Sequence, residues 1–184
     1  MNNKSGDSIR VVYPLFPVED GGSNPTSPLQ LKIYEIDAKL AVKLNDLWHS
    51  RLPTITNPYS KFSVSFGAEY KNQWFASAIW TDPIARSFNG LNYLELRRMA
   101  ISNDAPKNTA SRMIKIMDIL IRKKFPDIVK LISYQDCDVH TGTIYKASNW
   151  HEANKSVKSN WQVGRKRNEY QASGAKIRWE KDLK

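Results

Sequence analysis

Apolar side chains recur at helical spacing in two stretches of the chain. In the first, intervals of three and four residues predict a helix of about four turns, with apolar positions at Ile36, Leu40, Leu44 and Leu47. Asp37 is placed to cap its start, and Pro53 to end the segment. The second stretch predicts a long helix over residues 109–124, stopped by Pro126, with a buried face formed by Met113, Ile116, Met117, Leu120 and Ile121.

Alternating or continuous apolar runs predict β-strands over much of the remaining chain. The expected strands cover residues 9–13, a hairpin of two strands within 61–80, and the segments 93–101, 128–134 and 175–180. A short helix is expected near residues 142–148. Residues 19–28 have the glycine, serine and proline content of an irregular loop.

The strand at 93–101, the helix at 109–124 and the strand at 128–134 predict a βαβ unit. A crossover of this kind makes the two strands parallel. The loops that leave them, residues 102–108 and 135–141, should then share one edge of the sheet, where open α/β sheets bind their ligands.

Length and composition predict one folded domain over residues 1–184. The chain is 41% hydrophobic and 25% charged, which suits a globular protein rather than a disordered one. A single cysteine, Cys137, excludes an intramolecular disulfide framework and a cysteine-rich zinc site. Without an apolar signal core or a membrane-spanning run, we expect a soluble protein in a reducing cytoplasm.

The sign of the charge points to a polyanionic partner. Lys and Arg number 28 against 18 Asp and Glu, which gives a net charge of +10. Such a balance is typical of proteins that bind nucleic acid, an anionic cofactor or an acidic membrane, and also of a merely solvated basic face. Half of this net positive charge lies in residues 151–184. Four aromatic residues are interleaved with the basic ones from position 150 onward: Trp150, Trp161, Tyr170 and Trp179. These rings either follow a phosphate backbone or pack the last strand.

The loop before the long helix has the chemistry of an anion site. Free amide groups and the helix dipole favour negative charge at a helix start, and Arg97, Arg98 and Lys107 add positive charge nearby. The alternative is that Asn108 or Thr109 only caps the helix.

Residues 133–143 are dense in hydrogen-bonding and titratable side chains. An aromatic ring beside a carboxylate suits an extruded base, because the ring stacks while the carboxylate accepts from an exocyclic amine. The alternative is that Asp136 and Asp138 only cap the next helix and that His140 is a structural histidine. Asp138 with His140, or His49 with Asp136, could also be metal ligands. The sequence contains no His-Glu-x-x-His, double Cys-x-x-Cys or facial-triad spacing, no Walker loop and no nucleophile elbow.

Five motifs extend over most of positions 45–150. They read HSRLP at 49–53, LELRRM at 94–99, DAPKNTAS at 104–111, SYQD at 133–136 and HTGTIYKA at 140–147. In order and content they resemble the Mom family of phage DNA-modification proteins. The resemblance implies a GNAT-like α/β fold, in which helices flank a central mixed, partly parallel sheet. It also implies conversion of adenine in double-stranded DNA to a carbamoylmethyl derivative at the exocyclic amine, which protects phage DNA from restriction in the host cytoplasm.

The same resemblance implies a set of site residues. The reacting centre, which is also the candidate ligand set for an iron ion, comprises His49, Asp136 and Tyr145. The donor site comprises Arg98, Lys107, Asn108, Thr109 and Ser111. Contacts to the DNA are expected from Arg51, Tyr134, His140, Thr143 and Lys146.

Residue chemistry suggests how the reacting centre works. The adenine amine is a poor nucleophile, so a carboxylate must accept its proton as the new bond forms, and Asp136 is our choice. Tyr145 can donate to the leaving group, His49 can assist proton transfer, and Tyr134 can stack on the base.

The donor is left open by one departure from the superfamily pattern. The loop expected to hold the coenzyme A pyrophosphate contains no glycine and includes Pro106, which lacks an N–H. Acetyl-CoA is the superfamily default, whereas a glycyl or other carbamoylmethyl source explains the product better. Two other functions also fit: an acyl-CoA-dependent N-acetyltransferase of a small molecule or protein, and a non-enzymatic, DNA-binding anti-restriction protein. Whether the protein is a monomer or a homodimer is open.

Overall fold

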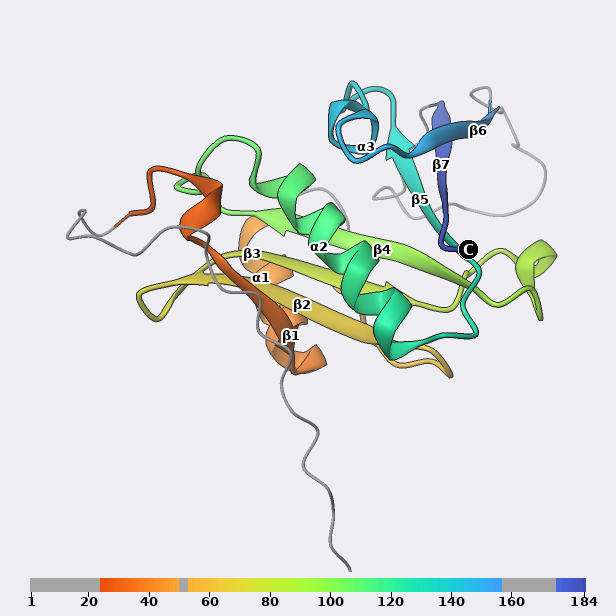
Figure 1. Cartoon of the computed structure of the whole chain (residues 1–184), viewed down its shortest axis with the longest axis horizontal. Coiled ribbons are helices and arrows are strands. Elements are labelled where there is room, and N and C mark those ends of the chain that lie inside the picture. Colours follow the sequence, from red (N-terminus) through yellow and green to blue (C-terminus); the bar gives the residue numbers. More distant parts are fainter. Residues whose placement is uncertain (1–23, 50–52, 157–174) are drawn as a thin grey trace, which may run out of the picture.

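A computed structural model describes residues 24–49, 53–156 and 175–184, and in these residues the strands form a single mixed sheet (Figure 1). The sheet order is β1-β2-β3-β4-β5-β7-β6. The strands are β1 (Lys32–Ile36), β2 (Val64–Tyr70), β3 (Gln73–Thr81), β4 (Tyr93–Ile101), β5 (Lys130–Asp136), β6 (His151–Ser156) and β7 (Lys176–Asp182). The α-helices are α1 (Ala38–Trp48), α2 (Thr109–Lys124) and α3 (Thr143–Lys146), and two single 3-10 turns are η1 (Pro28–Gln30) and η2 (Arg86–Phe88).

The pairing of β4 with β5 is parallel, whereas the other neighbouring strands are antiparallel. This confirms the predicted βαβ unit. The parallel pairing runs only from Tyr93 opposite Lys130 to Leu96 opposite Ser133. Beyond these positions the two strands separate toward their carboxyl ends (Figure 1).

Helices α2 and α1 cover opposite faces of the first four strands (Figure 1). On the α2 side lies the main core, in which the Trp80 indole N–H points at the Met117 sulfur at 3.1 Å. On the α1 side a smaller cluster joins Ala41, Ile55 and Ile79. Mixed strand directions with helices on both faces confirm the predicted α/β fold class.

The two predicted helices differ in how well their buried faces were assigned. Helix α2 and strand β4 have the predicted bounds. The cap of α1 is also confirmed, since the Asp37 carboxylate accepts from the Lys39 amide at 2.8 Å and the Leu40 amide at 3.2 Å. Leu47 was wrongly placed in the buried face and is 72% exposed, because the helix packs through Ala41, Leu44 and Asn45.

Strands β1 and β6 were not predicted. Both lie at edges of the sheet. An edge strand has one neighbour to pack against, so its sequence need not carry a strong apolar alternation. The predicted strand at 9–13 lies outside the described residues, as does all but the end of the predicted loop at 19–28. No helix among the described residues is long and apolar enough to cross a bilayer.

Candidate functional site

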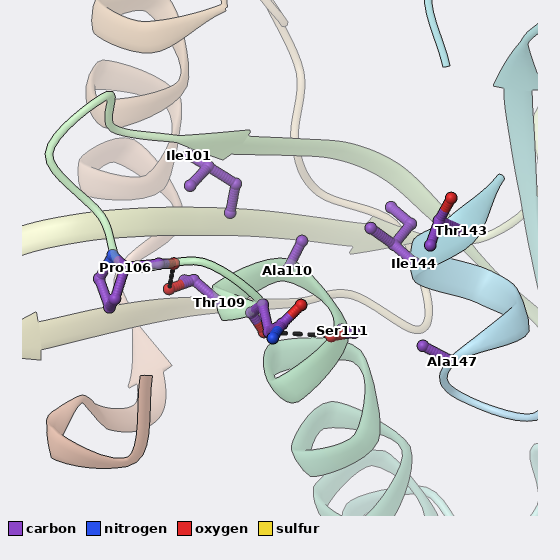
Figure 2. A pocket seen from close by; sticks show the side chains of 9 residues that line it. Ile101, Pro106, Thr109, Ala110, Ser111, Thr143, Ile144 and Ala147 are labelled. Carbon is purple, nitrogen blue, oxygen red and sulfur yellow. Dashed lines mark hydrogen bonds between the residues drawn. The ribbon is translucent and has the colours of Figure 1, made fainter. Parts of the chain in front are cut away.

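A pocket of about 200 Å³ lies between the start of α2 and helix α3 (Figure 2). The end of β4, the following loop, the first turn of α2, and α3 together supply its walls: Ile101, Pro106, Asn108, Thr109, Ala110, Ser111, Thr143, Ile144 and Ala147. We call this the α2–α3 pocket. It lies at the carboxyl-end side of β4, where ligands are expected in a parallel unit.

Local hydrogen bonds shape the α2 side of this pocket. Asn108 adopts a left-handed backbone conformation with φ of 68°, and its side chain makes no capping hydrogen bond. The Thr109 hydroxyl donates to the Pro106 carbonyl at 2.7 Å, and the Ser111 hydroxyl to the Asn108 carbonyl at 3.1 Å (Figure 2). These bonds shape a turn that brings the first residues of α2 to the pocket wall.

Three of the five predicted donor residues line the pocket, namely Asn108, Thr109 and Ser111. Lys107 precedes them in the chain but is not part of the wall. Arg98 lies elsewhere, beside the buried carboxylate of Glu95. Thr143, predicted as a DNA contact, lies in the wall of this pocket, where it shares a 2.8 Å hydrogen bond with the Thr141 hydroxyl.

Tyr145 is buried behind β5. Its hydroxyl shares a 2.9 Å hydrogen bond with the Ser133 hydroxyl, and its ring stacks on Trp179 with centroids 5.3 Å apart and an interplanar angle of 16°. Burial raises the pKa of Tyr145, and the Ser133 hydrogen bond opposes this shift. The phenol therefore stays protonated near neutral pH and is able to donate a proton or hydrogen bond.

Tyr134 and Asp136 face the opposite side of β5 from Tyr145. Side chains alternate along a strand, so Ser133, which points to Tyr145, lies on the other face from both. Tyr134 is 38% exposed, and burial, together with the charge of Glu95, raises its pKa. The Asp136 carboxylate accepts from the Asp138 amide at 3.0 Å and so closes the turn after β5. The structure therefore brings Tyr134 and Asp136 together on one face and places Tyr145 on the other.

A buried carboxylate that the sequence reasoning did not select lies beside Tyr134. The Glu95 side chain accepts from the Ile84 amide at 3.1 Å. Burial raises the pKa of Glu95, against that hydrogen bond and the charges of Arg97 and Arg98. The sequence did contain a sign of Glu95: it is the single acidic residue of the predicted strand 93–101 and lies between two leucines. A carboxylate in a buried strand is a candidate functional residue. We call Glu95, Tyr134 and Asp136 the acidic face.

A bulge positions the two arginines that follow Glu95. The register between β3 and β4 shifts so that Ile79 faces Arg98 while Trp80 faces Leu96, which leaves Arg97 as the extra residue. The Arg97 guanidinium donates to the Asn57 carbonyl at 3.0 Å, and that of Arg98 to the Arg97 carbonyl at 2.9 Å. Positive charge is thus held next to the acidic face.

Of the remaining predicted site residues, His140 and Lys146 lie on the surface after β5, whereas His49 lies at the end of α1. His140 is exposed, and its carbonyl accepts from the Gln135 side chain. Lys146 is exposed on α3, with its ammonium 6.0 Å from the Trp179 ring centroid. His49 lies at the C-terminal cap of α1, where its amide donates to the Asn45 carbonyl at 2.7 Å. Arg51 lies outside the described residues.

Two of the four aromatic residues interleaved with basic ones near the C-terminus, Trp150 and Trp179, are not on the surface. Trp150 and Trp179 are buried in the main core, and their indole N–H groups donate to Asp118 at 3.2 Å and to Gln135 at 2.8 Å. For these two the alternative of packing the last strand is confirmed. Trp161 and Tyr170 lie outside the described residues.

His49, Asp136 and Tyr145 do not fit an iron site. The Tyr145 hydroxyl is buried and already paired with Ser133. Asp136 faces the other side of the strand. In the described ranges, no group of three or more His, Cys, Asp and Glu side chains is arranged to hold a metal ion.

Solved acetyltransferase structures are similar in fold. A ribosomal-protein-alanine N-acetyltransferase from Escherichia coli matches with a TM-score of 0.59 and 12% identity, over 82% of this chain and 92% of that one. A Bacillus subtilis acetyltransferase in complex with CoA has a TM-score of 0.58 and 10% identity, with coverages of 83% and 98%. A GNAT family acetyltransferase from Elizabethkingia anophelis with acetyl-CoA bound has a TM-score of 0.55 and 13% identity, with coverages of 83% and 98%. At such identities the likeness concerns the fold, which is that of the GNAT acetyltransferases.

Sequence comparison gives the family. No curated protein sequence matches the chain. The model of the Mom protein family matches residues 63–182, from just before β2 to the end of β7, and so includes the α2–α3 pocket and the acidic face. Because this match spans more than half of the chain, the protein belongs to the Mom protein family.

Proposed function

We propose that this protein is a DNA-modifying transferase that converts adenine in double-stranded DNA to N6-carbamoylmethyladenine, and thereby protects phage DNA from restriction in the cytoplasm of the bacterial host. The observation that carries the proposal is the match to the Mom family across the residues that form both the pocket and the acidic face. The fold of acyl-group transferases supports a transfer reaction, and the net charge of +10 supports a DNA substrate.

The α2–α3 pocket is the proposed donor site. Structures of the same fold that contain CoA or acetyl-CoA support a donor of this class. Helix α2 directs its dipole and its first amides toward an anion, and Asn108, Thr109 and Ser111 would hold the donor. A volume of about 200 Å³ accepts part of such a molecule rather than all of it. Acyl transfer alone would give an N6-acyladenine, so the carbamoylmethyl product requires a donor, glycyl-derived or other, whose leaving group departs from the methylene carbon. Such a donor would use the same wall.

The acidic face is the proposed site of proton acceptance. As the amine of adenine forms its new N–C bond to the donor, it must lose one proton, while the donor's leaving group takes the electron pair of the bond that breaks. Asp136, which lies on the accessible face of β5, or Glu95, whose raised pKa favours proton uptake, would accept that proton. Tyr134, between them on the surface, offers a ring for the base.

Because Tyr145 and Asp136 lie on opposite faces of β5, they can act on one reaction only at the place where β4 and β5 have separated. The strand pairing ends at Leu96 and Ser133, and Ser133 is the residue bonded to Tyr145. At the point where the parallel pairing ends, groups on both faces of β5 would be able to reach the same substrate. There the protonated phenol supports the donor from one side, while the base and its carboxylate approach from the other. His49 would assist the proton transfer, and Arg51, His140 and Lys146 would contact the DNA.

Nucleoside mass spectrometry of plasmid DNA from expressing cells tests the proposal. The native chain should increase the mass of deoxyadenosine by one carbamoylmethyl group in place of a hydrogen. Asp136→Ala and Tyr145→Phe should each lower the modified fraction by about a hundred-fold. Glu95→Gln, assayed beside Asp136→Asn, shows which carboxylate takes the proton. Normal modification by both Asp136→Ala and Tyr145→Phe would contradict the assigned roles.

An acyl-CoA-dependent N-acetyltransferase is the second candidate, favoured by the fold of the similar structures. It predicts acetyl transfer to free amines and leaves the nucleosides of plasmid DNA unchanged. The third candidate, a DNA-binding protein without activity, predicts salt-sensitive DNA binding and no covalent change.

A further inference from the structure

The loop between β3 and β4, residues 82–92, exposes two large aliphatic side chains. Ile84 is 64% exposed and Leu91 is 45% exposed. The loop contains η2 and projects beyond the end of the sheet at which β4 begins (Figure 1). Exposed apolar side chains are common singly, but two large ones on one projecting loop are candidates for contact with a partner.

The loop is held in place along its length. The Asp82 carboxylate accepts from the amides of Lys61 and Phe62 at 3.1 and 3.2 Å. The Ile84 amide donates to Glu95 at 3.1 Å. A side chain mounted on a backbone fixed in this way loses little conformational entropy when it meets a partner.

The far end of the loop is also anchored. The Phe88 ring packs on Tyr93, with centroids 5.6 Å apart, and the Arg178 guanidinium lies 5.1 Å from the Phe88 ring centroid. Arg178 in turn lies beside Tyr134 in the pairing of β7 with β5. The loop is therefore connected to the acidic face at two points, through Glu95 and through Arg178.

The chemistry of the loop favours DNA as the partner. Arg86 is exposed within it, and Arg97 and Arg98 follow on β4, so the surroundings attract phosphates. An isoleucine side chain makes no hydrogen bond to a phosphate or to a base edge. Its contacts with DNA are apolar: packing on a thymine methyl group, or insertion between stacked bases as minor-groove proteins use aliphatic wedges, and only the second opens the stack beside a target base.

We propose that Ile84 is a wedge that enters the DNA stack beside the target adenine and fills the space that the extruded base leaves, with Leu91 bracing the neighbouring base pair. This inference rests on the proposed function, because it presumes a base that leaves the duplex. The Glu95 contact couples the two events: the backbone that carries the wedge is bonded to a carboxylate of the acidic face. The residue belongs to base extrusion and not to the transfer chemistry.

Two DNA substrates separate extrusion from chemistry. One is a fully paired duplex, and the other places an abasic site opposite the target adenine, so that unpairing is already done. Ile84→Ala should lower the modification rate on the paired duplex by about ten- to a hundred-fold, since unstacking a base step costs a few kcal/mol. On the abasic duplex its rate should stay within about two-fold of the native rate. Ile84→Leu should retain most activity on both.

Ile119→Ala is the matched control. Ile119 is another aliphatic side chain, 55% exposed on α2, and its removal should change neither rate. An equal loss on both substrates by Ile84→Ala, or no loss on either, would overturn the wedge. Unfolding midpoints of the variants should equal that of the native chain, because the lost side chain is exposed.

A binding measurement keeps the wedge testable apart from catalysis. With 2-aminopurine in place of the target adenine, the native chain should increase the fluorescence as the base unstacks, and Ile84→Ala should give less than half of that increase. If the native chain modifies neither substrate, the proposed function fails, and this signal still decides the wedge. An undiminished fluorescence increase with Ile84→Ala refutes it.

Discussion

The side chains of the seven-residue strand β5 alternate between two faces, which differ in burial and in hydrogen bonding. On one face Ser133 and Gln135 are buried and hydrogen-bonded to Tyr145 and Trp179. On the other, Tyr134 and Asp136 are accessible among charged neighbours. The two-residue period of the strand thus separates two surfaces. We call the buried one, with Ser133 and Gln135, the closed wall, and the accessible one, with Tyr134 and Asp136, the open face.

The sharpest way to break the closed wall is at Gly142, which precedes α3. Its φ is +74°, and a Cβ there would lie 2.5 Å from the Gln135 Oε1 and 2.6 Å from the Trp179 Cζ2. Gly142→Ala should lower the free energy of unfolding by about 3 kcal/mol, since backbone strain and overpacking add. Gly90→Ala, with a similar φ of +79° and no atom within 4 Å, should cost only about 1 kcal/mol. Equal urea midpoints for the two variants would contradict the steric account.

The free energy of unfolding should depend on pH through Asp118, whose partner Trp150 packs against Tyr145 on the closed side of β5. This buried carboxylate on α2 accepts from the Trp150 indole at 3.2 Å, and burial raises its pKa to about 7, against that bond and the charges of Lys181 and Arg122. Because the folded pKa lies above the usual 3.8, folding takes up a proton between these values. The contribution of protonated Asp118 to the free energy of unfolding is therefore complete below about pH 4 and is lost as the pH rises through 7.

Asp118→Asn tests this dependence, since the amide keeps an acceptor oxygen and does not ionise. Relative to the variant, the native chain should lose about 4 kcal/mol between pH 4 and pH 8. Unfolding curves in urea across that range provide the measurement. Parallel pH profiles for the two proteins would show that Asp118 titrates as an exposed acid does.

On the open face, Tyr134→Ala should weaken DNA binding and leave the fold intact. Loss of a stacked base costs about 1 to 3 kcal/mol, so KM for duplex DNA should rise by about ten-fold or more while kcat changes little. Tyr134→Phe retains the ring and should behave as the native chain. If Phe is as poor as Ala, the hydroxyl beside Arg178 matters and stacking does not.

The smallest effect is expected from one hydroxyl of the closed wall. Ser133→Ala leaves the Tyr145 hydroxyl without its partner and should lower the unfolding free energy by about 1 kcal/mol. Ser87→Ala, at an exposed position in η2, should stay within about 0.5 kcal/mol of the native value. A loss of equal size at both positions would show that the Ser133 bond adds nothing.

Part of the site was predictable because it depends on local chain geometry. The position of the loop before α2 follows from a strand, a polar loop and a helix start that are adjacent in sequence, and Asn108, Thr109 and Ser111 of this loop and helix start line the pocket. Glu95 was missed because its burial beside Tyr134 and its contact with the Ile84 amide depend on the tertiary structure. Leu47 was misassigned because periodicity gives a stripe of positions and not the angle at which the helix packs.

The sequence by itself determined the βαβ unit, the long helix α2, the excess of positive charge and the motifs of the family, because each depends on neighbours along the chain or on composition. Only the tertiary structure decided which groups share a surface. Where β4 and β5 stop pairing, which face of β5 each side chain occupies, and how the β3–β4 loop is anchored all follow from strand register and a bulge. A shift of one residue in either would exchange the two faces, and no local pattern specifies that register alone.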